Sequence, residues 1–240
     1  MKNPLDQFLI KKIIPLQFEG VDLSFTNASL AMVLVTLSIM ALQYFGLRGS
    51  LIIPGKVQAL FESSYDFIAD MVKENAGREA KSYAPFIFSL FMFVLISNLL
   101  GMFPYSFTVT SHFAVTFTLA ICVFLTVTVV GFVKHGFHFF RLFFPAGVPL
   151  WMAPILVPLE LLSYLIRPIT LSVRLFLNMA AGHILLKVFA GFALTLGLYS
   201  FAPVLFNVMF IGFEFFVAVL QAYIFTILTC IYLNDALNLH

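Results

Sequence analysis

Residues 150–196 read LWMAPILVPLELLSYLIRPITLSVRLFLNMAAGHILLKVFAGFALTL, an apolar run with few polar interruptions. About 40 helical residues at 1.5 Å each reach roughly 60 Å, whereas the hydrocarbon core of a bilayer is about 30 Å thick. A second long apolar run follows at 204–233. We therefore expect two long helices that bend or tilt strongly, and Pro154, Pro158 and Pro168 favour bends in the first of them.

The composition of the whole chain identifies lipid as its main solvent. Of 240 residues, 62% are hydrophobic and 10% are charged, whereas soluble domains are about 45–50% apolar and about 25% charged. A soluble fold of this size could not cover so much apolar surface. A soluble enzyme, a disordered tail and a disulfide scaffold are therefore excluded, and the net charge of +2 gives no reason to expect nucleic acid as a partner.

The remaining apolar runs predict an all-α integral membrane protein that forms one membrane domain over residues 1–240. Runs of about 18 or more apolar residues are candidate spans, and a segment that mixes apolar and charged residues at helical spacing is typical of a helix lying on a membrane surface. The predicted elements are a first transmembrane helix at 28–47, an amphipathic surface helix at 54–81, a helical hairpin at 85–103 and 113–133, and a long tilted hairpin at 150–196 and 204–233.

The basic residues of the connections orient the chain. The connection 48–81 holds five Lys or Arg residues and 134–141 holds two, whereas 104–112 and 197–203 hold none. The positive-inside rule places the first two connections on the cytoplasmic or matrix side, together with the C-terminus. Three lysines near the N-terminus argue the other way, but all four connections agree. The first 20 residues lack the features of a signal or mitochondrial transit peptide, so we expect insertion in a bacterium or synthesis inside an organelle.

A polar stripe runs along the first long segment. Glu160, Arg167 and Arg174 are seven residues apart, about 20° short of two helical turns, so an ideal helix carries them on one face. Asn178 lies one turn beyond Arg174, beside the same stripe. Arg167 either reaches a membrane surface or pairs with Glu160, and we expect Asp235 to be a surface group at a helix end.

The second long segment repeats this spacing. Asn207, Glu214 and Gln221 are again seven residues apart, and antiparallel packing would bring the two stripes together. His183 lies nine residues past Arg174, about half a turn away on an ideal helix, so we expect it to face a different partner, for which Glu214 is a candidate. Charged residues inside a membrane usually mark an ion path.

The chemistry of these groups favours proton movement. Arg174 stays protonated at any working pH, so it cannot carry protons, but it can hold a passing carboxylate in its ionised form and block a direct leak. His183 and Glu214 can change protonation near neutral pH. The set fits a stationary subunit that works on a moving partner with its own carboxylates. We expect no metal site, no cofactor and no catalytic residue.

Two segments carry a family resemblance. PITLSVRLFLNMAAGH at 168–183 and LQAYIFTILTCIYLNDALNLH at 220–240 resemble the signature segments of subunit a of the rotary proton-translocating ATP synthase, in its mitochondrial and alphaproteobacterial form. The resemblance implies a non-catalytic stator subunit of the membrane sector that couples proton flow to rotation and ATP synthesis. It also implies an upright first helix and long tilted helices beside a ring of c subunits.

The partners that the resemblance implies are the c-subunit ring, b-type peripheral stalk subunits, other ATP synthase subunits and the lipid bilayer. The location that it implies is an energy-converting inner membrane, either mitochondrial or bacterial. Arg174 matches the family's essential arginine, which faces the ring carboxylates and separates two half-channels. Asn178 and Gln221 match polar residues close to it, and Glu160 matches a residue of the half-channel on the matrix or cytoplasmic side.

His183 and Glu214 match the two titratable positions of the half-channel on the opposite side, with Asn207 near its entrance. Many bacterial members have Glu then His at these positions, whereas mitochondrial and alphaproteobacterial members have His then Glu, as here. Three alternatives remain open at this point. They are a self-contained secondary transporter that binds a substrate between Arg174 and Glu214, a structural subunit whose stripes are merely buried pairs, and a sodium-driven version of the same machine.

Overall fold

The computed structural model describes residues 12–15, 17–18, 21–22, 24–47, 55–103, 107–143, 152–195 and 197–238. Within these residues the chain is an all-α membrane protein, as predicted, and five of its helices are long and apolar enough to cross a membrane. Those five helices are α1 (Asn27–Leu47), α3 (Ala84–Gly101), α4 (Phe113–His135), α5 (Ala153–Thr195) and α6 (Phe201–Leu237). The other helical elements are α2 (Lys56–Ala76) and the short 3₁₀ helices η2 (Arg78–Tyr83), η3 (Val109–Ser111), η4 (Gly136–Phe143) and η6 (Gly197–Ser200).

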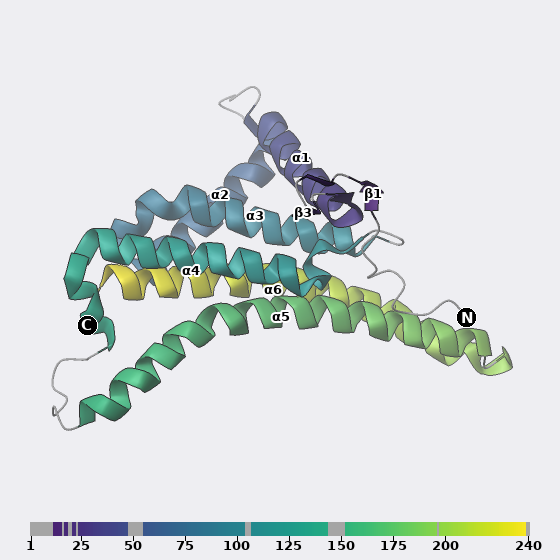
Figure 1. Ribbon diagram of the computed structural model, residues 1–240. Coiled ribbons are helices and arrows are strands. Elements are labelled where there is room, and N and C mark those ends of the chain that lie inside the picture. Colours follow the sequence, from purple (N-terminus) through teal and green to yellow (C-terminus); the bar gives the residue numbers. More distant parts are fainter. Residues whose placement is uncertain are drawn as a thin grey trace.

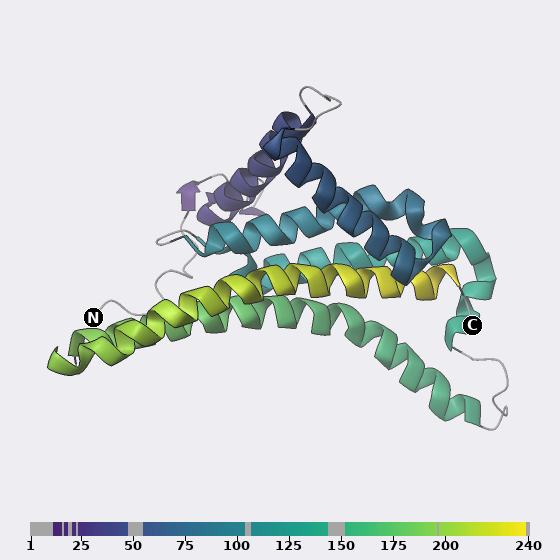
Figure 2. The ribbon, with the colours of Figure 1, turned by 180° about the vertical axis from the view of Figure 1, so that it is seen from behind.

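Helix α6 is the centre of the fold. It packs against α2, α3, α4 and α5, and the last four helices run side by side with α1 and α2 crossing them on one side (Figures 1 and 2). The side chains on α6 that meet its neighbours are fully buried and mostly small or hydroxylated. They include Ala218, Ala222, Thr226, Thr229 and Cys230. Small residues let helix backbones approach closely, which is how helices associate where lipid removes the hydrophobic driving force.

Helix α5 is strongly curved, as its prolines predict. Both views show it as an arch whose first half diverges from α6 (Figures 1 and 2). Pro158 and Pro168 lie inside its 43 residues, and each removes a backbone hydrogen bond from the helical ladder. Pro154 lies in the first turn, where a missing N–H costs nothing. The predicted limits of this helix, at 150 and 196, lie outside the described residues.

The amphipathic helix is shorter than the predicted 54–81, whose first residue lies outside the described residues. It ends at Ala76 because Gly77 adopts a φ of +80°, a left-handed value that glycine takes without steric cost. The chain then continues as η2 and enters α3 at Ala84. One face of α2 is buried against its neighbours, through Phe61, Ile68, Met71, Val72 and Ala76.

The N-terminal part contains short strands that the sequence did not predict. Strand β1 (Lys12–Ile14) pairs antiparallel with β4 (Phe25–Thr26), and β2 (Gln17–Phe18) pairs with β3 (Val21–Asp22). With two or three residues each, these strands are too short to show the alternation that identifies a strand in a sequence. They lead directly into α1, whose first turn is capped by the Thr26 hydroxyl accepting the N–H of Ser29 at 3.3 Å.

Polar bonds connect the helices at several depths. Asn98 on α3 is fully buried, and its Nδ2 donates to the carbonyl of Ala218 on α6 at 3.1 Å. Near the far end of α6, Lys134 on α4 forms an ion pair with Glu79, and the Nε2 of His135 lies 3.0 Å from the carbonyl oxygen of Leu237. The bonds of Asn98 and His135 join α3 and α4 to α6, and the ion pair joins α4 to η2.

Gly131 is the point on α4 where this packing is tightest. A Cβ at Gly131 would lie 2.7 Å from Cδ2 of the buried Phe139 and 3.4 Å from Cβ of Ala236 on α6. We expect Gly131→Ala to destabilise the fold by about 1–3 kcal/mol, because the ring has no free space into which to move. The midpoint of thermal unfolding in detergent measures this. Gly212→Ala on α6, where a Cβ meets nothing within 4 Å, is the control, and an equal effect of the two changes would contradict the packing argument.

Candidate functional site

The α5–α6 hairpin brings the two polar stripes together. The helices run antiparallel, so positions late in α5 meet positions early in α6. Asn178 Nδ2 donates to Gln221 Oε1 at 2.8 Å. Five residues further along α5, His183 Nδ1 lies 3.8 Å from Glu214 Oε1, as the half-turn offset of His183 from Arg174 suggested.

Arg167 does not pair with Glu160, which is one of the two arrangements expected from the sequence. Its Nη1 pairs with Oδ2 of Asp235 on α6 at 3.0 Å, so Asp235 is no free surface group and Glu160 is not the partner. The guanidinium also lies 5.6 Å from the ring centre of Tyr164 and 5.0 Å from that of Tyr232. An arginine between two aromatic faces gains cation–π stabilisation without losing its charge.

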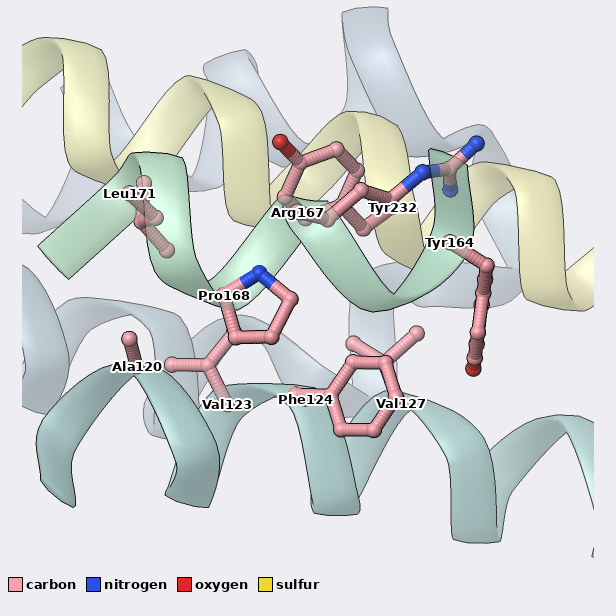
Figure 3. A pocket seen from close by; sticks show the side chains of 9 residues that line it. All are labelled: Ala120, Val123, Phe124, Val127, Tyr164, Arg167, Pro168, Leu171 and Tyr232. Atoms are coloured by element: carbon pink, nitrogen blue, oxygen red, sulfur yellow. The ribbon is translucent and has the colours of Figure 1, made fainter. Parts of the chain in front are cut away.

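This arginine sits where α4, α5 and α6 meet. Figure 3 shows Arg167 and Tyr232 close together on one side of a small cavity, with Pro168 pointing toward α4. Tyr164 is fixed in turn, because its hydroxyl lies 2.6 Å from Oγ1 of Thr128 on α4. The lining is apolar apart from these groups, so the cavity is a packing feature beside an anchored charge. Its residues are Ala120, Val123, Phe124, Val127, Tyr164, Arg167, Pro168, Leu171 and Tyr232.

Arg174 has an entirely different environment. It is exposed on the open surface of α5 and, within the described residues, has no ion pair or hydrogen bond. Leu177 and Ala181, three and seven residues further along α5, are exposed and apolar, and the exposed Thr170 lies one turn before Arg174. The arrangement presents a positive charge on a mostly apolar surface.

Glu160 lies well away from the His183–Glu214 pair. The 23 residues between Glu160 and His183 span about 35 Å of helix, with Arg174 between them. Glu160 is half-buried and makes no ion pair or side-chain hydrogen bond with the rest of the described chain. The predicted site residues therefore form two groups on opposite sides of Arg174.

The His183–Glu214 pair is enclosed. Glu214 is 4% exposed, and the second ring nitrogen of His183, Nε2, lies 3.0 Å from Oγ1 of Thr108. Thr108 precedes η3, in the connection between α3 and α4. No sequence pattern predicts this contact, because it joins residues 75 positions apart and the connection carries no Lys, Arg, Asp or Glu.

Buried polar atoms without a hydrogen-bond partner among the described residues occur on α3, at η3 and on α6, the element that carries Glu214. Buried polar atoms normally bond to protein or to ordered water, so the buried oxygens of Asn207 and Glu214 on α6 suit contact with ordered water. Burial also lowers the pKa of His112, which lies just after η3. The atoms are Ser97 Oγ and Asn98 Oδ1 on α3, Thr110 Oγ1 and His112 Nε2 at η3, and Asn207 Oδ1, Glu214 Oε1 and Gln221 Nε2 on α6.

Comparison with known proteins identifies the family. A family model described as ATP synthase A chain matches residues 28–234. The chain belongs to this family. Two sequences from Rhodospirillum rubrum, one of them from a named strain, are each described as ATP synthase subunit a. Both are 52% identical to this chain over 244 residues, and the alignment covers 100% of this chain and 100% of each relative.

Membership of the ATP synthase A chain family confirms the resemblance carried by residues 168–183 and 220–240, including its alphaproteobacterial character. The position of Glu160 on one side of Arg174 and of the His183–Glu214 pair on the other is also relevant to this family, because its members are components of a proton-driven complex. Thr108 and Gly182 also belong to the site, although neither is among the site residues predicted from the sequence.

Gly182 determines how closely α5 and α6 approach at the pair. A Cβ at this position would lie 2.6 Å from Glu214 Oε1 and 3.1 Å from its Cδ. We expect Gly182→Ala to push the carboxyl group away from His183 and to lower ATP-driven proton pumping on the order of tenfold, because proton transfer depends steeply on geometry. Acidification of inverted membrane vesicles measures it.

Gly191→Ala is the matched control for that change. It makes the same substitution nine residues along α5, where a Cβ would meet nothing within 4 Å. Pumping in the control should stay near the unsubstituted level. Equal pumping by both variants would show that the position of Glu214 relative to His183 does not matter.

Proposed function

We propose that this chain is the proton-conducting stator subunit of the ATP synthase membrane sector, with two offset half-channels that deliver protons to and from the carboxylates of a c-subunit ring. Membership of the family supports the coarser part of this statement. The chain is a subunit of ATP synthase that takes part in proton translocation and works with other subunits of that complex. With five apolar helices, it is a multi-pass protein of an energy-converting inner membrane.

The exposed Arg174 is the observation that carries the proposal. An unpaired charge facing lipid is costly, so a cation on an apolar surface implies an anionic partner from outside this chain. A carboxylate brought beside it would be held in its ionised form, because an opposite charge within a few ångströms lowers the carboxyl pKa. Arg174 keeps its own proton, so it separates the two half-channels. Asn178 and Gln221 hold the surface beneath it through their mutual hydrogen bond.

The outer half-channel uses Asn207, Glu214 and His183. A proton enters from the periplasmic or intermembrane side past the half-buried Asn207, passes to the Glu214–His183 pair and neutralises a ring carboxylate near Arg174. The unbonded buried oxygens of Asn207 and Glu214 support this route, since they suit a path of ordered water. The neutral carboxyl group then rotates into lipid at a much lower cost than a carboxylate, because lipid disfavours a charged group far more than a neutral one.

The inner half-channel lies near Glu160, on the other side of Arg174. After almost a full turn of the ring, the carboxyl group reaches this side and releases its proton to the matrix or cytoplasm. The membrane potential supplies about 2.3 kcal/mol per charge per 100 mV. The chain acts without a catalytic residue, metal or cofactor of its own, held by b-type stalk subunits while the ring moves.

Arg174→Ala tests the central role. We expect it to abolish coupled ATP synthesis while protons leak passively through the membrane sector, because the barrier between the half-channels is lost. ATP synthesis and passive proton conduction in inverted vesicles measure the two effects. Arg167→Ala removes another arginine of α5 and should lower the amount of assembled complex without causing the leak. Normal ATP-driven pumping by Arg174→Ala would overturn the proposal.

Joint neutralisation of the pair tests the outer half-channel. We expect the double variant His183→Gln and Glu214→Gln to block passive proton conduction through vesicles stripped of the catalytic sector, since the relay loses both titratable groups. Undiminished conduction would support a purely structural role for these residues. Substrate transport by the purified chain alone in liposomes would instead support a self-contained transporter.

A further inference from the structure

We propose that Thr108 is a positioning residue for His183, which fixes the ring and its tautomer so that Nδ1 is presented to Glu214. The inference rests on the proposed function, since it assigns a role within the outer half-channel. It concerns a residue from the connection between α3 and α4, outside the α5–α6 hairpin.

The hydrogen-bond geometry of Thr108 favours the arrangement in which its hydroxyl donates to Gly101 and accepts from His183, because the carbonyl oxygen of Gly101 can only accept. Its hydroxyl carries a single hydrogen, and Oγ1 donates to the carbonyl oxygen of Gly101 at 3.2 Å. The same Oγ1 lies 3.0 Å from His183 Nε2. With its hydrogen already donated, the hydroxyl must accept from the ring, so Nε2 carries a hydrogen. The neutral ring of His183 then has its lone pair on Nδ1.

Thr108 itself is held firmly. It is 5% exposed, and its carbonyl oxygen accepts both the backbone N–H of Ser111 at 3.3 Å and the Ser111 hydroxyl at 2.7 Å. Gly101 allows the close approach, because a Cβ there would lie 3.2 Å from both Cβ and Oγ1 of Thr108. A residue anchored at its backbone and its hydroxyl can orient the imidazole that it contacts.

The orientation matters because of what faces Nδ1. Glu214 Oε1 lies 3.8 Å away and has no hydrogen-bond partner among the described residues. When Glu214 carries a proton, its O–H bond can break as an Nδ1–H bond forms, after a small approach of the side chains or through one water. The products are a carboxylate and an imidazolium whose Nε2–H still bonds to Thr108. In the other tautomer, Nδ1 already carries a hydrogen and cannot accept the proton.

Few other charges act on this pair. Glu214 faces His183 from α6, and Lys187 lies one turn further along α5. His112 belongs to the segment that carries Thr108, and since burial lowers its pKa, its ring is neutral near pH 7. The basic side chains of α4 lie in the last turn of that helix, at the opposite end from this site.

Three variants of the intact complex test the inference. Thr108→Val keeps the shape but removes the hydroxyl, Thr108→Ser restores it, and Thr110→Val makes the same change in a buried neighbour whose hydroxyl has no partner among the described residues. Passive proton conduction is measured between pH 5 and 9, as about that range brackets histidine titration, in inverted vesicles with the catalytic sector removed.

We expect Thr108→Val to lower conduction about three- to tenfold, the effect of losing one hydrogen bond that selects a reactive form. Its half-maximal conduction should move to lower pH, because a bond accepted from the ring is stronger when the ring is protonated. Thr108→Ser should regain most of the rate and the original pH profile, and Thr110→Val should match the unsubstituted complex.

Two results would overturn the inference. One is a Thr108→Val complex whose rate of proton conduction and pH profile are unchanged. The other is an equal reduction of the rate in Thr108→Val and Thr110→Val with no change in pH profile, which would indicate an effect on packing alone. Failure of the proposed function is distinguishable, because conduction would then also survive joint neutralisation of His183 and Glu214. If that double variant blocks conduction while Thr108→Val has no effect, the proposed function stands and the role of Thr108 falls.

Discussion

The free-energy cost of placing a charge in a medium of low dielectric constant determines where the charged side chains of this protein lie. A charged side chain in hydrocarbon needs an opposite charge, a hydrogen bond, an aromatic face or water. Arg167 meets this requirement within the chain, through Asp235 and two tyrosine rings. Arg174 has no such partner among the described residues and is exposed on a mostly apolar surface. Its role therefore differs from the structural role of Arg167, only seven residues away.

The same constraint explains why the helices cross where they do. Nearly every polar contact between distant segments joins one helix to α6 or α5. Asn98 reaches a backbone carbonyl of α6, Asn178 reaches Gln221, and Thr108 reaches His183. In lipid such bonds replace the hydrophobic effect as a source of specificity, and small residues such as Gly131 and Gly182 let the backbones come close enough to form them.

The fold was largely predictable from the sequence, because helix length and hydropathy are local properties that the bilayer imposes directly. Proline positions likewise predicted the curvature of α5. The half-turn offset of His183 from Arg174 predicted a different partner for His183, and the structure places it beside Glu214. The seven-residue period did not predict that Arg167 and Arg174 have different environments. The pairing of Arg167 with Asp235 and the contact of Thr108 with His183 depend on tertiary packing between segments 68 and 75 residues apart, and no local period encodes that. The early end of α2 came from the left-handed backbone of a single glycine, Gly77.

The central position of α6 has a mechanical consequence. A sideways load applied at the exposed face of α5 passes directly into α4 and α6, which both pack against α5, and from α6 into α2 and α3. Because four helices share the load, no single contact has to bear it, and the arch of α5 is braced near its middle, where Arg174 lies. The α5–α6 hairpin is therefore stiffened along one side by the helices that pack against it. As a result, Arg174 keeps its position when a neighbouring subunit moves past it.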